Sequence, residues 1–198
     1  MKDMIALTGL AKTRVDAGFS RVGRRLSASD PADQALMITA ARAIAQANAI
    51  MALSERGLAN ESLPILRGLA EVCLTMRWVA EKDSAERAVA ALAELQDPDW
   101  ETHWPSARLR ERAGAYTVPG EVLETVLGSA ADFARGSAQG LPWGHVFSEA
   151  TRPGRRAEEV LPATAVFLGH ALKALDGRWP GEFPGAEEMW TGAKISRG

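Results

Sequence analysis

The sequence contains only one cysteine, Cys73, and only one tyrosine among its 198 residues. A lone cysteine excludes an internal disulfide, and the apolar neighbours of Cys73 favour inert packing over a reactive thiol. Runs of β-branched residues, which are typical of strands, are absent. Charge of either sign is not in excess, since 23 Lys and Arg face 25 Asp and Glu. A general attraction of the whole surface to nucleic acid is therefore not expected.

We also expect no membrane-spanning segment and no export signal in this sequence. We expect no apolar run of membrane-spanning length, and Lys12, Arg14 and Asp16 interrupt the N-terminus before a signal-peptide core can form. The expected location is the cytoplasm, with no membrane partner. With 46% hydrophobic residues, the chain can bury one sizeable core, so a single helical domain over residues 1–198 is expected.

Capping and breaker residues divide the chain into helices. Asp30 and Pro31 predict the start of a long alanine-rich helix, and Gly57 predicts its end. An amphipathic helix with a basic outer face is expected within residues 1–27, and its arginines are the one surface that could meet a nucleic acid. The fold class predicted is all-α, a single antiparallel bundle of about five or six main helices.

The bundle core is expected over residues 30–175, and its last strong helix over Glu158 to Leu175. His170 lies on that helix among apolar residues, which is typical of a packing histidine. An irregular, aromatic-rich tail is expected over residues 178–198. Its aromatic residues predict that it packs back on the bundle or lies at an interface.

The helix expected near residues 60 to 82 is apolar in almost every direction, so we place it at the centre of the bundle. On a 3.6-residue period, Arg67, Glu71 and Trp78 share one stripe of this helix. A charge inside an apolar interior must be paired. Two interpretations stay open. The pair is either an internal ion pair or solvated edge, or it lines a pocket and holds a ligand.

The run from Ile65 to Val72, which contains Arg67 and Glu71, resembles the Arg-x-x-x-Glu helix of bacterial proteins in the domain of unknown function 5677 family. That family also has a loop with the pattern aromatic, Ser, acid or small, hydrophobic, His, Pro before its last long helix. The run Phe147 to Pro153 is similar to this loop, with Arg152 where the family usually has His. The resemblance spans roughly residues 35 to 175 and implies an antiparallel helical bundle without a settled activity.

The resemblance also implies a distant similarity to HEPN-type nucleases and to nucleotide-binding helical domains. HEPN ribonucleases place Arg and His on one helix, separated by four to six residues. His103, His145 and His170 all lack an Arg at that spacing. We therefore do not expect nuclease activity of that type.

The function favoured by these patterns is binding of a small anionic or polar ligand. The ligand-binding residues expected are Arg67, Glu71, Trp78, His145, Ser148 and Arg152. Arginine suits this role because its planar guanidinium can bind a carboxylate or a phosphate through two hydrogen bonds. We expect no cofactor, and the acids around His103 in residues 97–105 are too weak a pattern to predict a metal.

Two other functions stay open. An enzyme could use Glu71 or His145 as a general base, with Arg67 and Arg152 orienting an anionic substrate group. Ser148 has no Gly-x-Ser-x-Gly elbow around it, so a serine nucleophile is not expected. A regulatory or assembly protein could use the alanine-rich helix and the aromatic tail as contact surfaces, and for it we expect a homodimer and a possible further protein partner.

Overall fold

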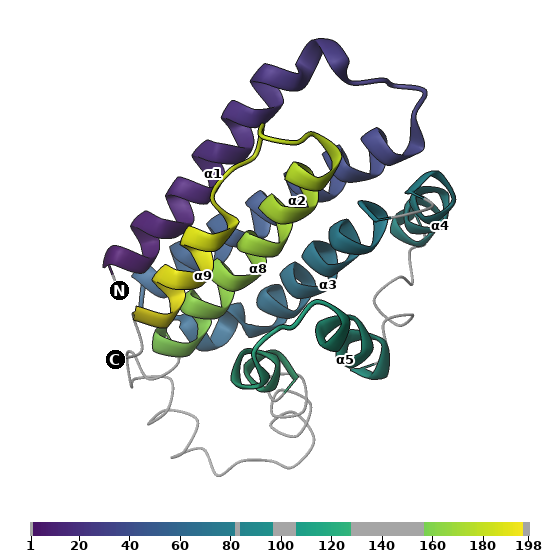
Figure 1. Ribbon diagram of the computed structural model, residues 1–198. Helices are drawn as coiled ribbons and strands as arrows, with labels where there is room; N and C mark the ends of the chain where they lie inside the picture. The colour runs from purple at the N-terminus through teal and green to yellow at the C-terminus, as the bar shows by residue number, and fades with distance from the viewer. Residues whose placement is uncertain (1, 82–83, 97–105, 128–156, 196–198) are drawn as a thin grey trace.

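A computed structural model describes residues 2–81, 84–96, 106–127 and 157–195 (Figure 1). Within these ranges the chain forms helices and no strand, which confirms the all-α fold class. The α-helices are α1 (Lys2–Val22), α2 (Pro31–Glu55), α3 (Leu63–Val79), α4 (Ser84–Gln96), α5 (Ser106–Ala115), α8 (Ala157–Arg178) and α9 (Ala186–Ile195). Two short 3₁₀ helices, η1 (Gly23–Arg25) and η2 (Ala59–Ser62), precede α2 and α3, and residues 120–127 are helical.

The ends of α2 follow the signals in the sequence. The Asp30 carboxylate accepts hydrogen bonds from the backbone N–H groups of Ala32 (2.8 Å) and Asp33 (3.3 Å). Pro31 is the first helical residue, where its missing N–H has no partner to lose. At the other end, Gly57 has a φ of 75°, in the left-handed region that glycine adopts without a steric cost. Both predicted boundaries of this helix are confirmed.

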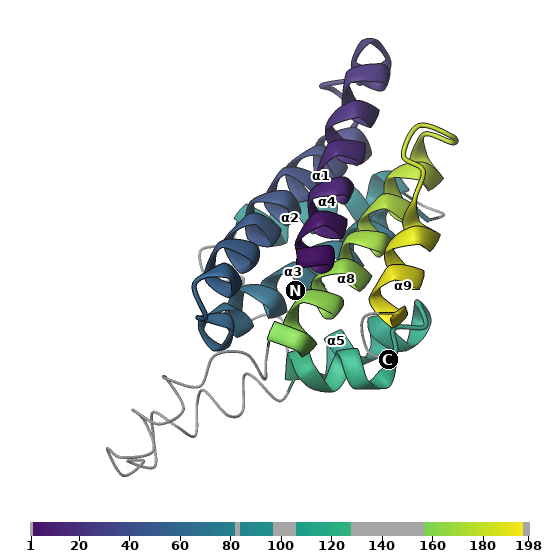
Figure 2. The same cartoon turned by 90° about the vertical axis from the view of Figure 1, so that its left-hand side faces the viewer.

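The most enclosed helix is α8 rather than α3. Every residue from 160 to 172 is buried, and α8 contacts α1, α2, α3 and α9. Figure 2 shows α8 between α9 on one side and α1, α2 and α3 on the other. The sequence predicted α3 at the centre because α3 is apolar all round. The buried run from 160 to 172 shows that α8 is also covered on every side. The alanines of α8 and Gly169 let its neighbours approach closely.

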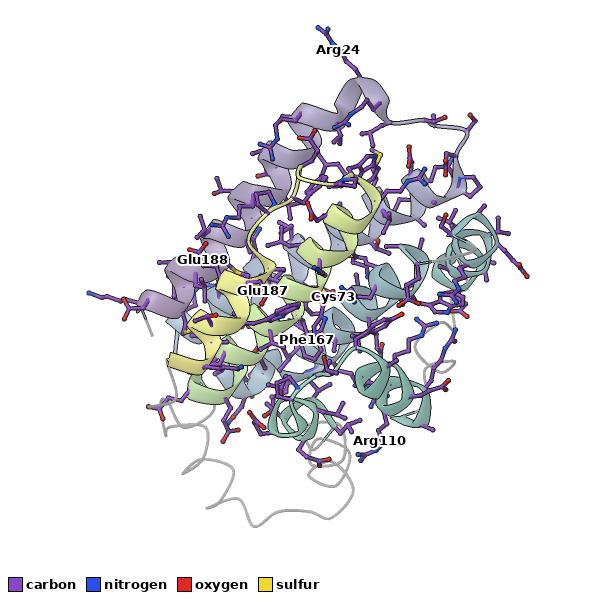
Figure 3. The ribbon with its side chains drawn as sticks, in the orientation of Figure 1. Arg24, Cys73, Arg110, Phe167, Glu187 and Glu188 are labelled. Atoms are coloured by element: carbon purple, nitrogen blue, oxygen red, sulfur yellow. The ribbon has the colours of Figure 1, made fainter. Side chains whose placement is uncertain are left out.

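The interior between α3 and α8 is apolar. Figure 3 shows Cys73 on α3 and Phe167 on α8 inside the bundle, and both are fully buried. Burial raises the pKa of the Cys73 thiol well above its usual range, so this thiol stays protonated and unreactive. In contrast, Arg24 and Arg110 extend into solvent at opposite ends of the molecule (Figure 3).

The chain after Arg178 is more regular than the sequence indicated. Its breakers, Pro180, Gly181, Pro184 and Gly185, fill a short turn only, and α9 follows. Acidic residues in the first turn of α9 favour this helix, because they lie at the positive end of its dipole.

This segment packs against α8 and α1. The ring centroid of Phe19 lies 6.0 Å from that of Trp179 and 5.1 Å from that of Phe183. An ion pair between Arg14 and Glu188 joins α1 to α9. Figure 3 shows Glu188 beside α1.

One expectation about hydropathy needs correction. Among the described residues, α2 is long and apolar enough to span a membrane by length and composition alone, with a mean hydropathy of 1.4 over 18 residues. No such run was expected from the sequence, where alanines rather than large aliphatic residues fill this helix. A core helix meets the same criterion, and α2 packs against α3, α4 and α8.

Candidate functional site

The charged pair predicted on α3 is turned toward the protein. Arg67 Nε donates a hydrogen bond to Glu71 Oε1 at 3.0 Å. The Glu71 side chain is 6% exposed and that of Arg67 is 22% exposed. Each of the two residues also has a further interaction beyond this pair. The pair therefore satisfies the requirement that a charge inside a helical bundle must have a partner.

Trp78, the aromatic member of the predicted stripe, stacks with the protein's own guanidinium groups. The guanidinium carbon of Arg112 lies 4.5 Å from the ring centroid, and that of Arg87 lies 5.3 Å from it. Arg112 Nη1 also donates to Thr75 Oγ1 at 2.9 Å. Burial, with a smaller effect from Arg108, lowers the pKa of Arg112 to about 10, so Arg112 stays charged at neutral pH. These contacts connect α3 to α4 and α5.

The other residues of the predicted site, His145, Ser148 and Arg152, lie outside the described residues. A ligand-binding role for Arg67, Glu71 and Trp78 together with them therefore stays a prediction. The acidic stretch around His103 lies outside the described residues as well. Within the described part of the chain, no group of three or more His, Cys, Asp or Glu side chains is placed to hold a metal ion.

A cavity of about 240 Å³ lies elsewhere, between the turn after α5 (residues 116–119), the helix at 120–127, α8 and α9. We call it the His170 cavity. Its lining combines aromatic, aliphatic and charged side chains: Tyr116, Thr117, Pro119, Glu121, Val122, Val166, His170, Trp190, Ala193 and Lys194. The sequence interpretation did not find this site, because it brings together short segments that are up to 78 positions apart, from residue 116 to residue 194.

His170 is the buried polar residue of this cavity. The residue is 3% exposed, and its Nδ1 atom has no hydrogen-bond partner within the described residues. Burial lowers the pKa of His170 to about 4, with a smaller effect from the positive charge of Arg77. The imidazole is therefore neutral at pH 7 and offers one donor and one acceptor. The sequence indicated a packing histidine, and the structure adds that this histidine lines a cavity.

Trp190 forms the wall next to His170. Its ring centroid lies 5.2 Å from that of His170, and its Nε1 donates to the backbone oxygen of Val166 at 3.1 Å. Gly169 makes this approach possible, because a Cβ atom at position 169 would lie 2.4 Å from Trp190 Nε1. A glycine directly before a histidine in an apolar helix was the signal in the sequence that could have indicated a close approach here.

Thr117 has the least usual backbone of the lining residues. Its φ of 53° lies in the left-handed region, and it is the only non-glycine residue with a positive φ among those the structure describes. Hydrogen bonds from Thr117 N to Gly114 O (3.3 Å) and from Val118 N to Ala113 O (2.9 Å) form a Schellman motif at the end of α5. Glycine normally occupies the left-handed position of this motif, and threonine, being β-branched, is strained there.

Arg77 on α3 places a positive charge next to the cavity. Its guanidinium carbon lies 5.0 Å from the centroid of the Tyr116 ring, and Tyr116 lines the cavity. Burial raises the pKa of Tyr116, and the charge of Glu81 and a hydrogen bond to it act in the same direction. The phenol is therefore un-ionised at neutral pH. Arg87 Nη1 donates to Glu81 at 2.9 Å, so the Glu81 charge is paired.

Comparison with known families connects only part of this structure to other proteins. Residues 33–100 match the model of a family of unknown function, DUF5677, which confirms the resemblance seen in the helix that contains Arg67 and Glu71. Neither the curated proteins nor the solved structures gave a match. The matched residues include most of α2 and all of α3 and α4, whereas every residue that lines the His170 cavity comes after residue 100. The family match therefore assigns no role to the cavity.

Proposed function

We propose that this protein, part of which matches a family of unknown function, binds a small molecule in the His170 cavity. The observation that supports this most directly is the buried imidazole in the cavity wall whose Nδ1 has no partner among the described residues. The large majority of buried side-chain polar atoms in proteins have a hydrogen-bond partner, so an exception needs an explanation. Nδ1 itself has less than 1 Å² of accessible surface, so a small shift of the ring or of its neighbours would bring it to a bound molecule that supplies the missing hydrogen bond.

Backbone strain at the same cavity supports the proposal. An unsatisfied buried polar group costs about 1–3 kcal/mol, and a left-handed L-residue costs about 1–2 kcal/mol. His170 and Thr117 each have one of these features, and both line the cavity. Costs of this kind gather at sites where function requires a particular geometry.

The dimensions of the cavity limit the ligand. Pockets for drug-sized molecules measure roughly 300–1,000 Å³. At about 240 Å³ the His170 cavity is smaller than these. The expected ligand is therefore a compact molecule, of the size of a single ring with its substituents. A nucleotide or a peptide segment is too large to be enclosed.

A fragment screen on a cavity-filling variant tests the proposal. Ala193 lines the cavity and is 3% exposed, so Ala193→Leu places three additional carbon atoms at this wall. The control is Gly177→Ala on α8, where a new Cβ meets nothing within 4 Å. Single-ring compounds are screened by ligand-observed NMR and then by thermal shift.

We expect compounds that bind the wild-type protein and Gly177→Ala but not Ala193→Leu. Binding that survives equally in Ala193→Leu would place the ligand elsewhere and contradict the proposal. The Arg67→Ala variant in the same screen tests the separate prediction for the Arg67 and Glu71 pair. Hits lost only in that variant would favour the site on α3.

Self-association is a second candidate function, and one surface feature favours it. Met37 is 42% exposed and Ile38 is 51% exposed on the outer face of α2, where Ala41 and Ala45 are also exposed. We propose that a second copy of the chain covers this apolar face, because exposed apolar residues that gather on one helix mark contact surfaces.

Light scattering after size-exclusion chromatography tests the dimer. Ile38→Lys is expected to give a monomer, because it places a charge in the proposed contact. Val89→Lys is the matched control, since Val89 is a 57% exposed aliphatic residue on α4. A wild-type protein that is monomeric at all concentrations, or a dimer that both variants preserve, would exclude this face as the contact.

A further inference from the structure

We infer that the His170 cavity selects a small planar molecule with a single negative charge, such as an aromatic carboxylate. This inference rests on the proposed ligand-binding function and adds the chemical class of the ligand. Charge, ring geometry and the state of the histidine each contribute a separate argument.

The charges around the cavity favour an anion. Lys194 lines the cavity and is exposed, and the Arg77 guanidinium lies against the ring of Tyr116. Among the described charged residues, Glu121 is the one acidic residue in the lining, and it already has an interaction of its own. Glu81, which also touches Tyr116, is paired with Arg87 and cancels it, so Lys194 and Arg77 against Glu121 leave a net charge of +1. A ligand with one negative charge balances it.

The rings around the cavity favour a flat molecule. Tyr116 and Trp190 come from different parts of the chain, and both line the cavity, as do the aliphatic Val122 and Val166. The Trp190 N–H is already bonded to Val166, so this ring contributes an apolar face rather than a donor. Aromatic side chains pack best against a planar partner, through stacked or edge-to-face contacts.

His170 contributes specificity without charge. A neutral imidazole forms a hydrogen bond with a neutral or an ionised group, whereas a charged imidazolium would bring a second cation into the interior. The cation that recognises the ligand is therefore Lys194. Because Lys194 is exposed, its ion pair with the ligand contributes up to about 1 kcal/mol, which corresponds to about a fivefold change in affinity.

Three probes of one shape separate the effect of charge from that of size. Benzoate, benzamide and benzylamine are titrated into the wild-type protein by calorimetry, together with Lys194→Gln and Lys173→Gln. Lys173 is an exposed residue of α8 that does not line the cavity, so its variant controls for the change in net charge. We expect benzoate to bind the wild-type protein about fivefold more tightly than benzamide, and benzylamine to bind least.

This preference should vanish in Lys194→Gln and persist in Lys173→Gln. Equal or tighter binding of benzamide, or a preference that survives in Lys194→Gln, would overturn the inference about charge. If none of the three probes binds, the inference also fails. The fragment screen then decides separately on the proposed function. Hits that Ala193→Leu blocks would support ligand binding in the His170 cavity, and a screen without hits would contradict it.

Discussion

Gly57→Thr and Thr117→Gly, made as separate variants, should change the free energy of unfolding in opposite directions, because both residues occupy the left-handed position of a Schellman motif. The Schellman motif that ends α2 has Gly57 in its left-handed position, with Leu58 N donating to Leu53 O at 2.8 Å. The motif that ends α5 has Thr117 in that position. Both residues are exposed, so a substitution at either one changes the backbone energy more than the packing.

The magnitude of the Thr117→Gly change follows from two opposing effects. The left-handed conformation costs an L-residue about 1–2 kcal/mol, and glycine removes this cost. Glycine also makes the unfolded chain more flexible, which reduces the gain by about 0.4–1 kcal/mol. We therefore expect Thr117→Gly to raise the free energy of unfolding by about 0.5–1 kcal/mol. For Gly57→Thr the same two effects act in reverse, so it should lower the free energy of unfolding by about 0.5–1 kcal/mol.

Urea unfolding followed by far-UV circular dichroism measures both changes on the same fold. A stability loss in Thr117→Gly would refute the assignment of strain to this residue. No loss in Gly57→Thr would refute the claim that the left-handed position requires glycine. Thr117 lines the His170 cavity, so Thr117→Gly should also weaken the binding of any compound found in the fragment screen. Higher stability with weaker binding is typical of strain retained for function.

Three further predictions concern stability. Gly169→Ala should lower the free energy of unfolding by about 1–3 kcal/mol because its Cβ displaces Trp190, whereas Gly177→Ala in the same helix should raise it by up to about 1 kcal/mol. Denaturant titration compares the two variants, and equal effects would contradict the close packing of Gly169 against Trp190. From pH 4 to pH 6.5 the unfolded chain binds more protons at His170 than the native chain does, so the free energy of unfolding should rise with pH. The rise should exceed that in His170→Phe by up to about 3 kcal/mol, and parallel pH profiles of the two proteins would exclude this. Asp33→Ala should cost about 2–4 kcal/mol, since Asp33 is buried and accepts bonds at 2.9 Å from Ser27 N and Arg178 Nε; unchanged chemical denaturation would contradict this.

The helices could be predicted because their signals are local. Asp30, Pro31 and Gly57 define the ends of α2 through hydrogen bonds and backbone angles that depend on neighbouring residues alone. The pairing of Arg67 with Glu71 is local as well, because residues four apart on a helix are neighbours. These features required no knowledge of the tertiary structure.

The cavity could not be predicted, because its parts come together only in the folded protein. Tyr116 lies in the turn after α5 and Trp190 lies on α9, and the sequence does not relate these two segments to each other. The left-handed backbone of Thr117 has no sequence signal, since threonine rarely adopts it. The position of α9 was also missed, because the prolines and glycines after Arg178 suggested an irregular tail.

The indole N–H signals of Trp190 and Trp78 provide the most direct test of where this protein binds a ligand. Each signal is assigned by a Trp→Phe variant and followed by two-dimensional NMR while a hit from the fragment screen is added. Trp190 lines the His170 cavity, whereas Trp78 stacks with Arg87 and Arg112 beside the Arg67 and Glu71 stripe. We predict a saturable shift of the Trp190 signal with the Trp78 signal unchanged. A shift of Trp78 alone would contradict the His170 cavity as the binding site.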